Sequence, residues 1–169
     1  MSSNSIRSVL FLCTGNAYRS RYAEAWFNYL CIMDPRNKHT LKAFSRGLNV
    51  TCGTLDACRL GYYPETRERL LEKQIPACCT GSSTRQVEYR DFLLADLVIC
   101  MYEIEHRPYI DEKFPSMSPI YWNIPDQFYA KRDCPEFEKL PRAEGFAMIE
   151  REVEKLYKNI AYTFSDYNI

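Results

Sequence analysis

The stretch that decides the fold is VLFLCTGNAYRS, residues 9–20. Its first four residues are apolar, a run that is too short for a helix and typical of a buried β-strand. The chain then turns polar around Cys13, and from Ser20 onward the apolar residues of SRYAEAWFNYLCIM recur every three or four positions, which predicts an amphipathic helix. We therefore expect a loop with one cysteine that connects a buried strand to a helix.

Composition restricts the class of protein. The 169 residues are 46 % hydrophobic, enough for one core, and we expect residues 1–169 to form a single domain. The 22 basic and 22 acidic side chains cancel, so no overall charge recruits nucleic acid or a membrane surface. Neither a secretory leader nor a membrane-spanning run is recognisable, which predicts a cytoplasmic protein with eight reduced cysteines. Without a CxxC pair, we expect no metal and no other cofactor.

Strand and helix patterns alternate along the rest of the chain. The predicted strands cover 9–12, 41–45, 95–101 and 119–122, and the predicted helices cover 20–33, 64–74, 102–114 and 142–164. Pro64 suits the first turn of its helix, whereas Pro108 should interrupt or kink the helix that contains it. Alternating strands and helices predict an α/β fold, in which a parallel sheet is covered by helices on both faces.

Ligands of such sheets bind beyond the carboxyl ends of the strands. Cys13, Ser45, Tyr102 and the loop after Trp122 would all lie at this edge. The cysteine loop and Asp126 are therefore expected to lie close together.

The loop around Cys13 has the features of an anion cradle. Backbone N–H groups at the start of a helix converge on one point, and the helix dipole adds positive potential that favours a thiolate. Arg19 offers a planar, charged fork for two oxygens, and Ser20 can donate a hydrogen bond to the thiolate. Gly15 and Asn16 tolerate the left-handed backbone of a tight loop. A cysteine and an arginine six positions apart are common by chance, but here they coincide with a strand, a loop and a helix.

At this point the chain resembles a known family. VLFLCTGNAYRSRYAEAWF is similar to the signature of the low-molecular-weight protein-tyrosine phosphatases and of the related thioredoxin-coupled arsenate reductases, C-x-G-N-x-C-R-S followed by a helix with Ala-Glu. FSRG, DFLLADLVICM and IPDQFYA are similar to later family segments. The resemblance implies a single-domain four-stranded parallel sheet in the order 2-1-3-4, flanked by helices. The family-defined loop positions that the chain keeps are Cys13, Gly15, Asn16, Arg19 and Ser20.

The resemblance also implies roles for individual residues. Cys13 would be the nucleophile, Arg19 would hold the phosphate and Asp126 would be the general acid, although Gln127 replaces the usual proline. Judged on its own, an aspartate after Pro125 could equally be a turn former.

The remaining roles belong to the loop and its surroundings. Ser45 matches the residue that holds the loop asparagine, or it could be a strand-end cap. Phe128 and Tyr129 match the aromatic pair that walls the site mouth, or they could be ordinary half-buried aromatics. The residues expected to complete the phosphate-binding loop are Thr14, Gly15, Asn16, Ala17, Tyr18 and Ser20.

Three departures from the family alter the surroundings of this loop. Tyr18 replaces a second loop cysteine, and Arg21 replaces a proline. Tyr102 occupies the position where the reductases need a cysteine and where the phosphatases have an aspartate that supports the loop. His106 or Arg107 could supply the lost support, unless both belong to a solvated helix face.

The leading hypothesis is a metal-independent phosphate monoester hydrolase that acts on phosphotyrosine in a protein or on a small aryl phosphate. Phosphate, sulfate or vanadate would occupy the loop. One alternative is an arsenate reductase or another thiol enzyme for oxyanions, which would need Cys78, Cys79 or Cys100 as its relay. Another is a phosphate-binding regulatory module with little turnover, because the support of the loop is altered.

Overall fold

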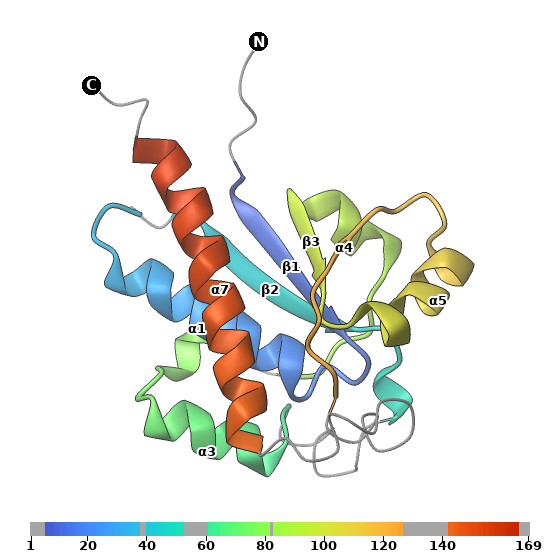
Figure 1. Ribbon diagram of the computed structural model, residues 1–169, viewed down its shortest axis with the longest axis horizontal. Coiled ribbons are helices and arrows are strands. Elements are labelled where there is room, and N and C mark those ends of the chain that lie inside the picture. Colours follow the sequence, from blue (N-terminus) through green and yellow to red (C-terminus); the bar gives the residue numbers. More distant parts are fainter. Residues whose placement is uncertain (1–5, 38–39, 53–60, 82, 127–141, 166–169) are drawn as a thin grey trace.

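The computed structural model describes residues 6–37, 40–52, 61–81, 83–126 and 142–165. Within these residues the chain alternates between strands (β), α-helices (α) and short 3-10 helices (η), as the sequence predicts (Figure 1). In chain order the elements are β1 (Ser8–Cys13), α1 (Arg19–Met33), β2 (Lys42–Gly47), η1 (Val50–Cys52), α3 (Pro64–Glu72), η2 (Ala77–Cys79), α4 (Tyr89–Leu94), β3 (Leu97–Cys100), α5 (Glu103–Lys113), β4 (Ile120–Tyr121) and α7 (Arg142–Ser165).

The four strands form one parallel sheet in the order β2-β1-β3-β4, which confirms the predicted topology. β1 is the central strand, and all six of its residues are buried. Its last residue, Cys13, pairs with Gly47 at the end of β2, and Leu12 pairs with Cys100 at the end of β3. The carboxyl ends of the three strands therefore meet at one edge, where the loop from β1 to α1 begins (Figure 1).

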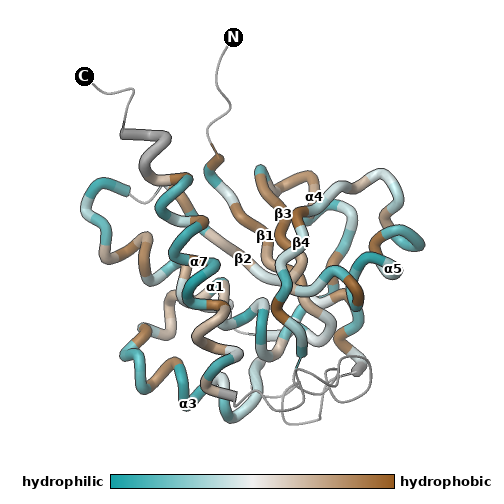
Figure 2. The backbone as a smooth tube through the Cα atoms, in the orientation of Figure 1, coloured by the Kyte–Doolittle hydropathy of each residue, from teal (hydrophilic) through white to brown (hydrophobic). Residues whose placement is uncertain are grey.

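Helices cover both faces of the sheet. Successive side chains of a strand point to opposite faces, so Val9 and Phe11 of β1 pack on the side of α1 and α7. Leu10 and Leu12 pack on the other side, with Phe92 of α4 and Ile110 of α5. In Figure 2 the central strands β1 and β3 are mostly hydrophobic, while β2 and the surrounding helices are mixed, as expected for a sheet buried between two helical layers.

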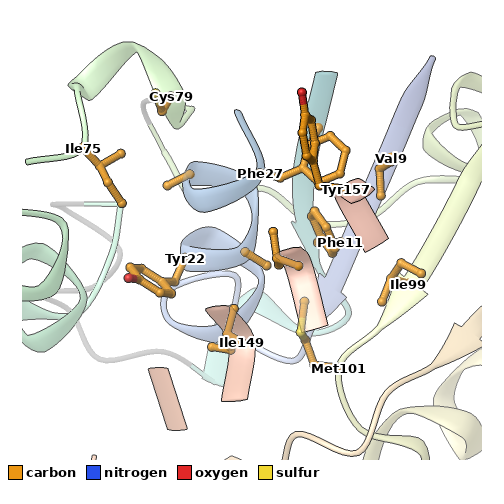
Figure 3. Close-up of a cluster of buried hydrophobic side chains, with 14 of the residues drawn as sticks. Val9, Phe11, Tyr22, Phe27, Ile75, Cys79, Ile99, Met101, Ile149 and Tyr157 are labelled. Carbon is orange, nitrogen blue, oxygen red and sulfur yellow. The ribbon is translucent and has the colours of Figure 1, made fainter. Parts of the chain in front are cut away.

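The larger core lies between the sheet, α1 and α7 (Figure 3). Phe27 of α1 meets Phe11 of β1 edge to face, with ring centroids 5.9 Å apart. The same ring meets Tyr157 of α7 at 5.6 Å, and Tyr22 meets Phe146 at 4.7 Å. Aromatic contacts of this geometry add to the area that the rings bury, so they attach α7 firmly to the helix that follows the cysteine loop.

The structure differs from the sequence-based expectation in two helices. α4 was not predicted. Its first turn is closed by a capping box, in which the Glu88 side chain accepts the backbone N–H of Asp91 and the Asp91 side chain accepts the backbone N–H of Glu88. α5 runs through Pro108 and does not end there, so of the two predicted outcomes, an interruption or a kink, the interruption is wrong. Proline removes one hydrogen bond of the ladder, but buried Ile110 anchors the turn beyond it and accepts a 2.8 Å hydrogen bond from the N–H of Phe114.

The long α7 has a polar outer face and a buried inner one. Buried Ile149 and Val153 are separated by exposed Arg151 and half-buried Glu152. Within the described part of the chain, no helix is long and apolar enough to cross a membrane.

Replacing Ile149 tests the importance of this packing. Ile149 is completely buried, so Ile149→Ala should lower the free energy of unfolding by about 2–5 kcal/mol through lost burial and a residual cavity. Ile104→Ala is the matched control, because that side chain is 65 % exposed and its loss should change stability by less than about 0.5 kcal/mol. Urea denaturation measures both. Equal losses for the two variants would contradict the assigned core.

Candidate active site

Cys13 ends β1 at the carboxyl edge of the sheet and is almost completely buried. Its Sγ lies 2.9 Å from Oγ of Ser20 in the first turn of α1. Two backbone bonds hold the start of the loop: the N–H of Leu48 donates to the carbonyl of Cys13, and the N–H of Asn49 donates to that of Thr14. The thiol is therefore fixed between a strand end and a helix N-terminus, where the sequence places it.

Asn16 shapes the loop through its backbone and its side chain. Its φ of 53° lies in the left-handed region, which asparagine tolerates better than most residues. Its Nδ2 donates to Ser45 Oγ at 2.8 Å and to Ser20 Oγ at 3.1 Å, while Oδ1 accepts the N–H of Arg85 at 2.9 Å. The predicted contact with Ser45 is therefore present. Gly15 differs from expectation, because its φ is not positive and a Cβ there would meet nothing within 4 Å.

A buried polar network continues behind Asn16. The Ser45 hydroxyl donates to Oε2 of Glu24 at 2.5 Å, and the N–H of Gly81 donates to Oε1 at 3.0 Å. Burial raises the pKa of Glu24. Arg21, which stands where the family has proline, lies 3.6 Å from Glu24 and donates to the carbonyl of Gly81. The network ties the loop to β2 and to the segment that follows η2.

Arg19 is the most constrained side chain of the site, because it is 1 % exposed and has an acidic partner on each of two sides. Its Nη1 and Nη2 donate to the two oxygens of Glu105 at 2.9 and 2.8 Å. Nη1 also donates to the carbonyl of Ile124 at 3.1 Å, and Nη2 lies 3.2 Å from Oδ2 of Asp126. Burial opposes the charge, but Glu105 and Asp126 hold the pKa of the guanidinium above its usual value.

The Nε nitrogen of this guanidinium makes none of these contacts. Nε of Arg19 is buried and has no hydrogen-bond partner within the described residues. A buried donor without a partner is costly, so the position suits an external acceptor.

Asp126 lies where the sequence analysis places it, beside the cysteine loop. The segment after β4 reaches this edge because the N–H of Ile124 donates to the carbonyl of Met101, just beyond β3. Cys13, Arg19 and Asp126 therefore gather at the carboxyl edge of the sheet. Phe128 and Tyr129, the predicted walls of the site mouth, lie outside the described residues.

Glu105 is the residue that the sequence analysis missed. It lies in the first turn of α5 and accepts hydrogen bonds from Arg19 and from the hydroxyl of Thr14. Burial alone would raise the pKa of this carboxyl, but the ion pair with Arg19 holds it well below its usual range. Its place directly after β3, at the ligand-binding edge, was the one signal in the sequence that could have found it.

Of the two residues that were expected to support the loop, His106 lies inside the protein and Arg107 lies on its surface. His106 is completely buried; its Nδ1 accepts the N–H of Tyr102 at 3.2 Å, and Nε2 lies 3.4 Å from Glu105. Burial lowers the pKa of His106, so the ring is neutral at pH 7. Arg107 is exposed and pairs with Glu103 on its own helix, so it belongs to the solvated face.

Tyr18 lies at the end of the loop but its ring packs into the core. The ring meets Phe146 of α7 edge to face, with centroids 4.9 Å apart. The preceding carbonyl, of Ala17, accepts the N–H of Tyr63 at 3.0 Å and the hydroxyl of Thr66 at 3.3 Å. The N-terminus of α3 therefore closes on the loop from one side while α7 closes on it from another.

Within the described residues, no group of three or more histidine, cysteine or acidic side chains is placed to hold a metal ion. The groups described at this edge include the thiol of Cys13, the hydroxyls of Thr14 and Ser20, the guanidinium of Arg19 and the carboxylates of Glu105 and Asp126. Such a set suits the binding of an oxyanion by charge and hydrogen bonds, next to a sulfur nucleophile.

A known protein family matches this chain over most of its length. The family model described as "Low molecular weight phosphotyrosine protein phosphatase" matches residues 8–164, nearly the whole chain. The chain belongs to this family. The sequence has no significant match among curated proteins.

Three solved structures illustrate the similarity of the fold. YfkJ from Bacillus subtilis is 26 % identical, with a TM-score of 0.70, and the match covers 96 % of this chain and 99 % of YfkJ. Wzb from Vibrio vulnificus, solved with benzylphosphonate, is 16 % identical, with a TM-score of 0.66 and coverage of 92 % and 99 %. A thioredoxin-dependent arsenate reductase from Corynebacterium glutamicum is 17 % identical, with a TM-score of 0.62 and coverage of 95 % and 65 %.

Membership of the low-molecular-weight phosphatase family makes the altered positions informative. Tyr18, in place of a loop cysteine, attaches the loop to α7 by packing. Glu105, three residues after Tyr102, binds the guanidinium of Arg19. Arg21, in place of a proline, is compensated by Glu24 and by a backbone carbonyl.

Gly47 provides a test of how closely β2 supports the loop. A Cβ at this position would lie 2.6 Å from Val50 Cγ1, 2.8 Å from the carbonyl oxygen of Thr14 and 3.1 Å from Asn16 Cβ. Gly47→Ala must displace the loop, so we expect a loss of about 1–3 kcal/mol in the free energy of unfolding and weaker binding of orthovanadate.

Gly15→Ala is the control for stability, since the space around that glycine is open. It should change the free energy of unfolding by anything from zero to a gain of about 1 kcal/mol. Guanidinium denaturation measures both variants. A Gly47→Ala protein as stable as the Gly15→Ala protein would show that the strand end does not constrain the loop.

Proposed function

We propose that the protein is a phosphate monoester hydrolase that acts on phosphotyrosine through a cysteinyl-phosphate intermediate. The observation that carries the proposal is the position of Cys13. Its Sγ lies 2.9 Å from the hydroxyl of Ser20, at the N-terminus of α1 and beside the buried charge of Arg19. A hydroxyl, a helix N-terminus and a guanidinium together favour a thiolate and an oxyanion in front of it.

In the first step, the Cys13 thiolate attacks phosphorus in line with the ester oxygen. The sulfur–phosphorus bond forms and the phosphorus–oxygen ester bond breaks, while Asp126 gives its proton to the leaving phenolate. Loop N–H groups and Arg19 hold the equatorial oxygens, whose charge grows in the transition state. No metal is needed, because the positive charge is supplied by the side chain and the backbone.

In the second step, a water molecule attacks the phosphorus of the cysteinyl phosphate. Asp126, now ionised, takes a proton from that water, and the sulfur–phosphorus bond breaks with release of inorganic phosphate. The Ser20 hydroxyl stabilises the departing thiolate by a hydrogen bond. The site returns to its starting protonation state.

Asp126 has to be released from Arg19 during this cycle. Its Oδ2 lies 3.2 Å from Nη2, which a phosphate oxygen would also use. The phosphate brings its own negative charge to the guanidinium, so it can replace the carboxylate there and leave Asp126 near the ester oxygen.

The cysteine positions favour hydrolysis over a thiol relay. Cys100 is completely buried, and burial raises the pKa of its thiol. Cys79 is buried as well, with a pKa raised to about 11 by burial and by Cys78. Its carbonyl is bound to Asn28, nine residues beyond Arg19 on α1, or about 13 Å along the helix axis. Burial therefore disfavours the thiolate that Cys79 or Cys100 would need for rapid exchange with Cys13.

The preference for an aryl ester rests on the family. Wzb, which has the same fold, binds benzylphosphonate, a phosphonate with an aromatic ring. We expect the substrate of this protein to be a phosphotyrosine side chain or a small aryl phosphate, with inorganic phosphate, sulfate or vanadate as competitive ligands.

Hydrolysis of an aryl phosphate between pH 4.5 and 8 tests this function. The wild type should give a bell-shaped profile with an acidic optimum, because the thiolate and the protonated acid are needed together. Cys13→Ser should abolish turnover. Asp126→Asn should lower kcat by about 10²–10⁴-fold and remove the decline at high pH. Cys78→Ser and Asp111→Asn, both exposed, are matched controls and should retain full activity.

Three results would contradict the proposal. Activity that survives in Cys13→Ser would exclude this nucleophile, and activity unaffected by Asp126→Asn would place the acid elsewhere. A wild type that binds vanadate but hydrolyses no aryl phosphate would favour the phosphate-binding module. Arsenate reduction that depends on Cys78, Cys79 or Cys100 would favour the reductase.

A further inference from the structure

Glu105 is an acidic residue that contacts the cysteine loop from outside it. Its side chain is 5 % exposed. Both of its oxygens accept from Arg19, at 2.8 and 2.9 Å, and Oε1 also accepts the hydroxyl of Thr14, the residue after the nucleophile. This carboxylate therefore binds two members of the cysteine loop from a different element, α5.

The bonds of Arg19 divide its guanidinium into two edges. Nη1 and Nη2 face Glu105, and the second hydrogen of Nη1 is directed to the carbonyl of Ile124. Nε has no partner within the described residues, and Nη2 contacts Asp126 as well. An incoming oxyanion can therefore bind the edge formed by Nε and Nη2. The Nε donor has no partner there, and the Nη2 donor becomes accessible when Asp126 moves away.

We propose that Glu105 is the positioning residue for Arg19: it fixes the guanidinium by the Nη1/Nη2 edge, so that the Nε/Nη2 edge is presented to the phosphate. This inference rests on the proposed function, because it concerns the same phosphate site. The bond to Thr14 adds a second effect, since it fixes the first loop residue after Cys13 relative to the same carboxylate.

The surroundings of Glu105 indicate whether it stays bound to Arg19 when phosphate binds or competes with phosphate for the guanidinium. A competitor must leave when substrate binds, but leaving would place a charged carboxylate in a closed environment without its partner. Glu105 is enclosed by Arg19, Thr14 and the neutral ring of His106, which is itself fixed by the N–H of Tyr102. Asp126 is 18 % exposed and contacts the edge that phosphate needs, so it is the acidic group that exchanges.

Glu105→Gln tests the inference, because it keeps the shape and removes the charge. An unfixed guanidinium should lower kcat/KM for an aryl phosphate by about 100-fold and weaken orthovanadate binding by about 10-fold. Glu103→Gln is the matched control: that residue occupies the same first turn, is 54 % exposed and pairs with Arg107. It should leave both measurements unchanged.

A double-mutant cycle separates positioning from a general structural effect. If Glu105 acts through Arg19, then Glu105→Gln should change vanadate affinity by less than about 3-fold in an Arg19→Lys background, where the fork is absent. Equal losses in both backgrounds would overturn the inference, as would tighter vanadate binding by Glu105→Gln, the result expected of a competitor.

Circular dichroism and thermal unfolding establish whether each variant is folded. If Glu105→Gln does not fold, Glu105→Asp decides the question, because it keeps the charge but withdraws the carboxylate by one methylene. A folded Glu105→Asp protein should bind vanadate at least about 10-fold more weakly than the wild type. Unchanged affinity would overturn the inference.

Failure of the proposed function is recognised separately. A wild type that binds vanadate without hydrolysing aryl phosphate would remove the function and leave the positioning of Arg19 measurable by binding. An active wild type with a fully active Glu105→Gln variant would remove the positioning role and leave the function. A wild type that neither binds vanadate nor turns over would overturn both.

Discussion

The guanidinium of Arg19 is a buried positive charge, and much of the site is arranged around its need for partners. A charge removed from water is tolerated only when acceptors surround it. Here the acceptors come from two other parts of the chain: Glu105 from the start of α5, and the carbonyl of Ile124 and the carboxylate of Asp126 from the segment after β4. Satisfying one side chain thus fixes the loops that follow β1, β3 and β4 relative to one another.

A second polar group fixes the other half of the loop. Asn16 binds Ser20, Ser45 and the backbone of Arg85, and Ser45 passes the connection on to Glu24. These are short-range bonds in a region without access to water, where each unpaired group would be costly. The cysteine loop is therefore held by an ionic contact on the side of α5 and by neutral hydrogen bonds on the side of β2.

The sequence was informative wherever a pattern repeats. The buried strands and the helices α1, α3 and α7 follow from apolar spacing, and the strand order followed from the family resemblance. α4 was missed because Leu93 and Leu94, exposed in the folded chain, spoil its amphipathic pattern. Glu105 was missed because it stands among charged residues that resemble a solvated helix face. Only tertiary packing turns one member of that group inward and leaves Arg107 outside.

The contact between Tyr18 and Phe146 links the end of the cysteine loop to the last helix of the chain. Tyr22 strengthens the link, because its hydroxyl donates to Glu150 on the same helix at 2.6 Å. Local openings of a protein follow such shared contacts, so residues that pack together tend to open together. We therefore expect the loop and α7 to open together, so that the amide groups of the loop exchange with solvent only when α7 undocks.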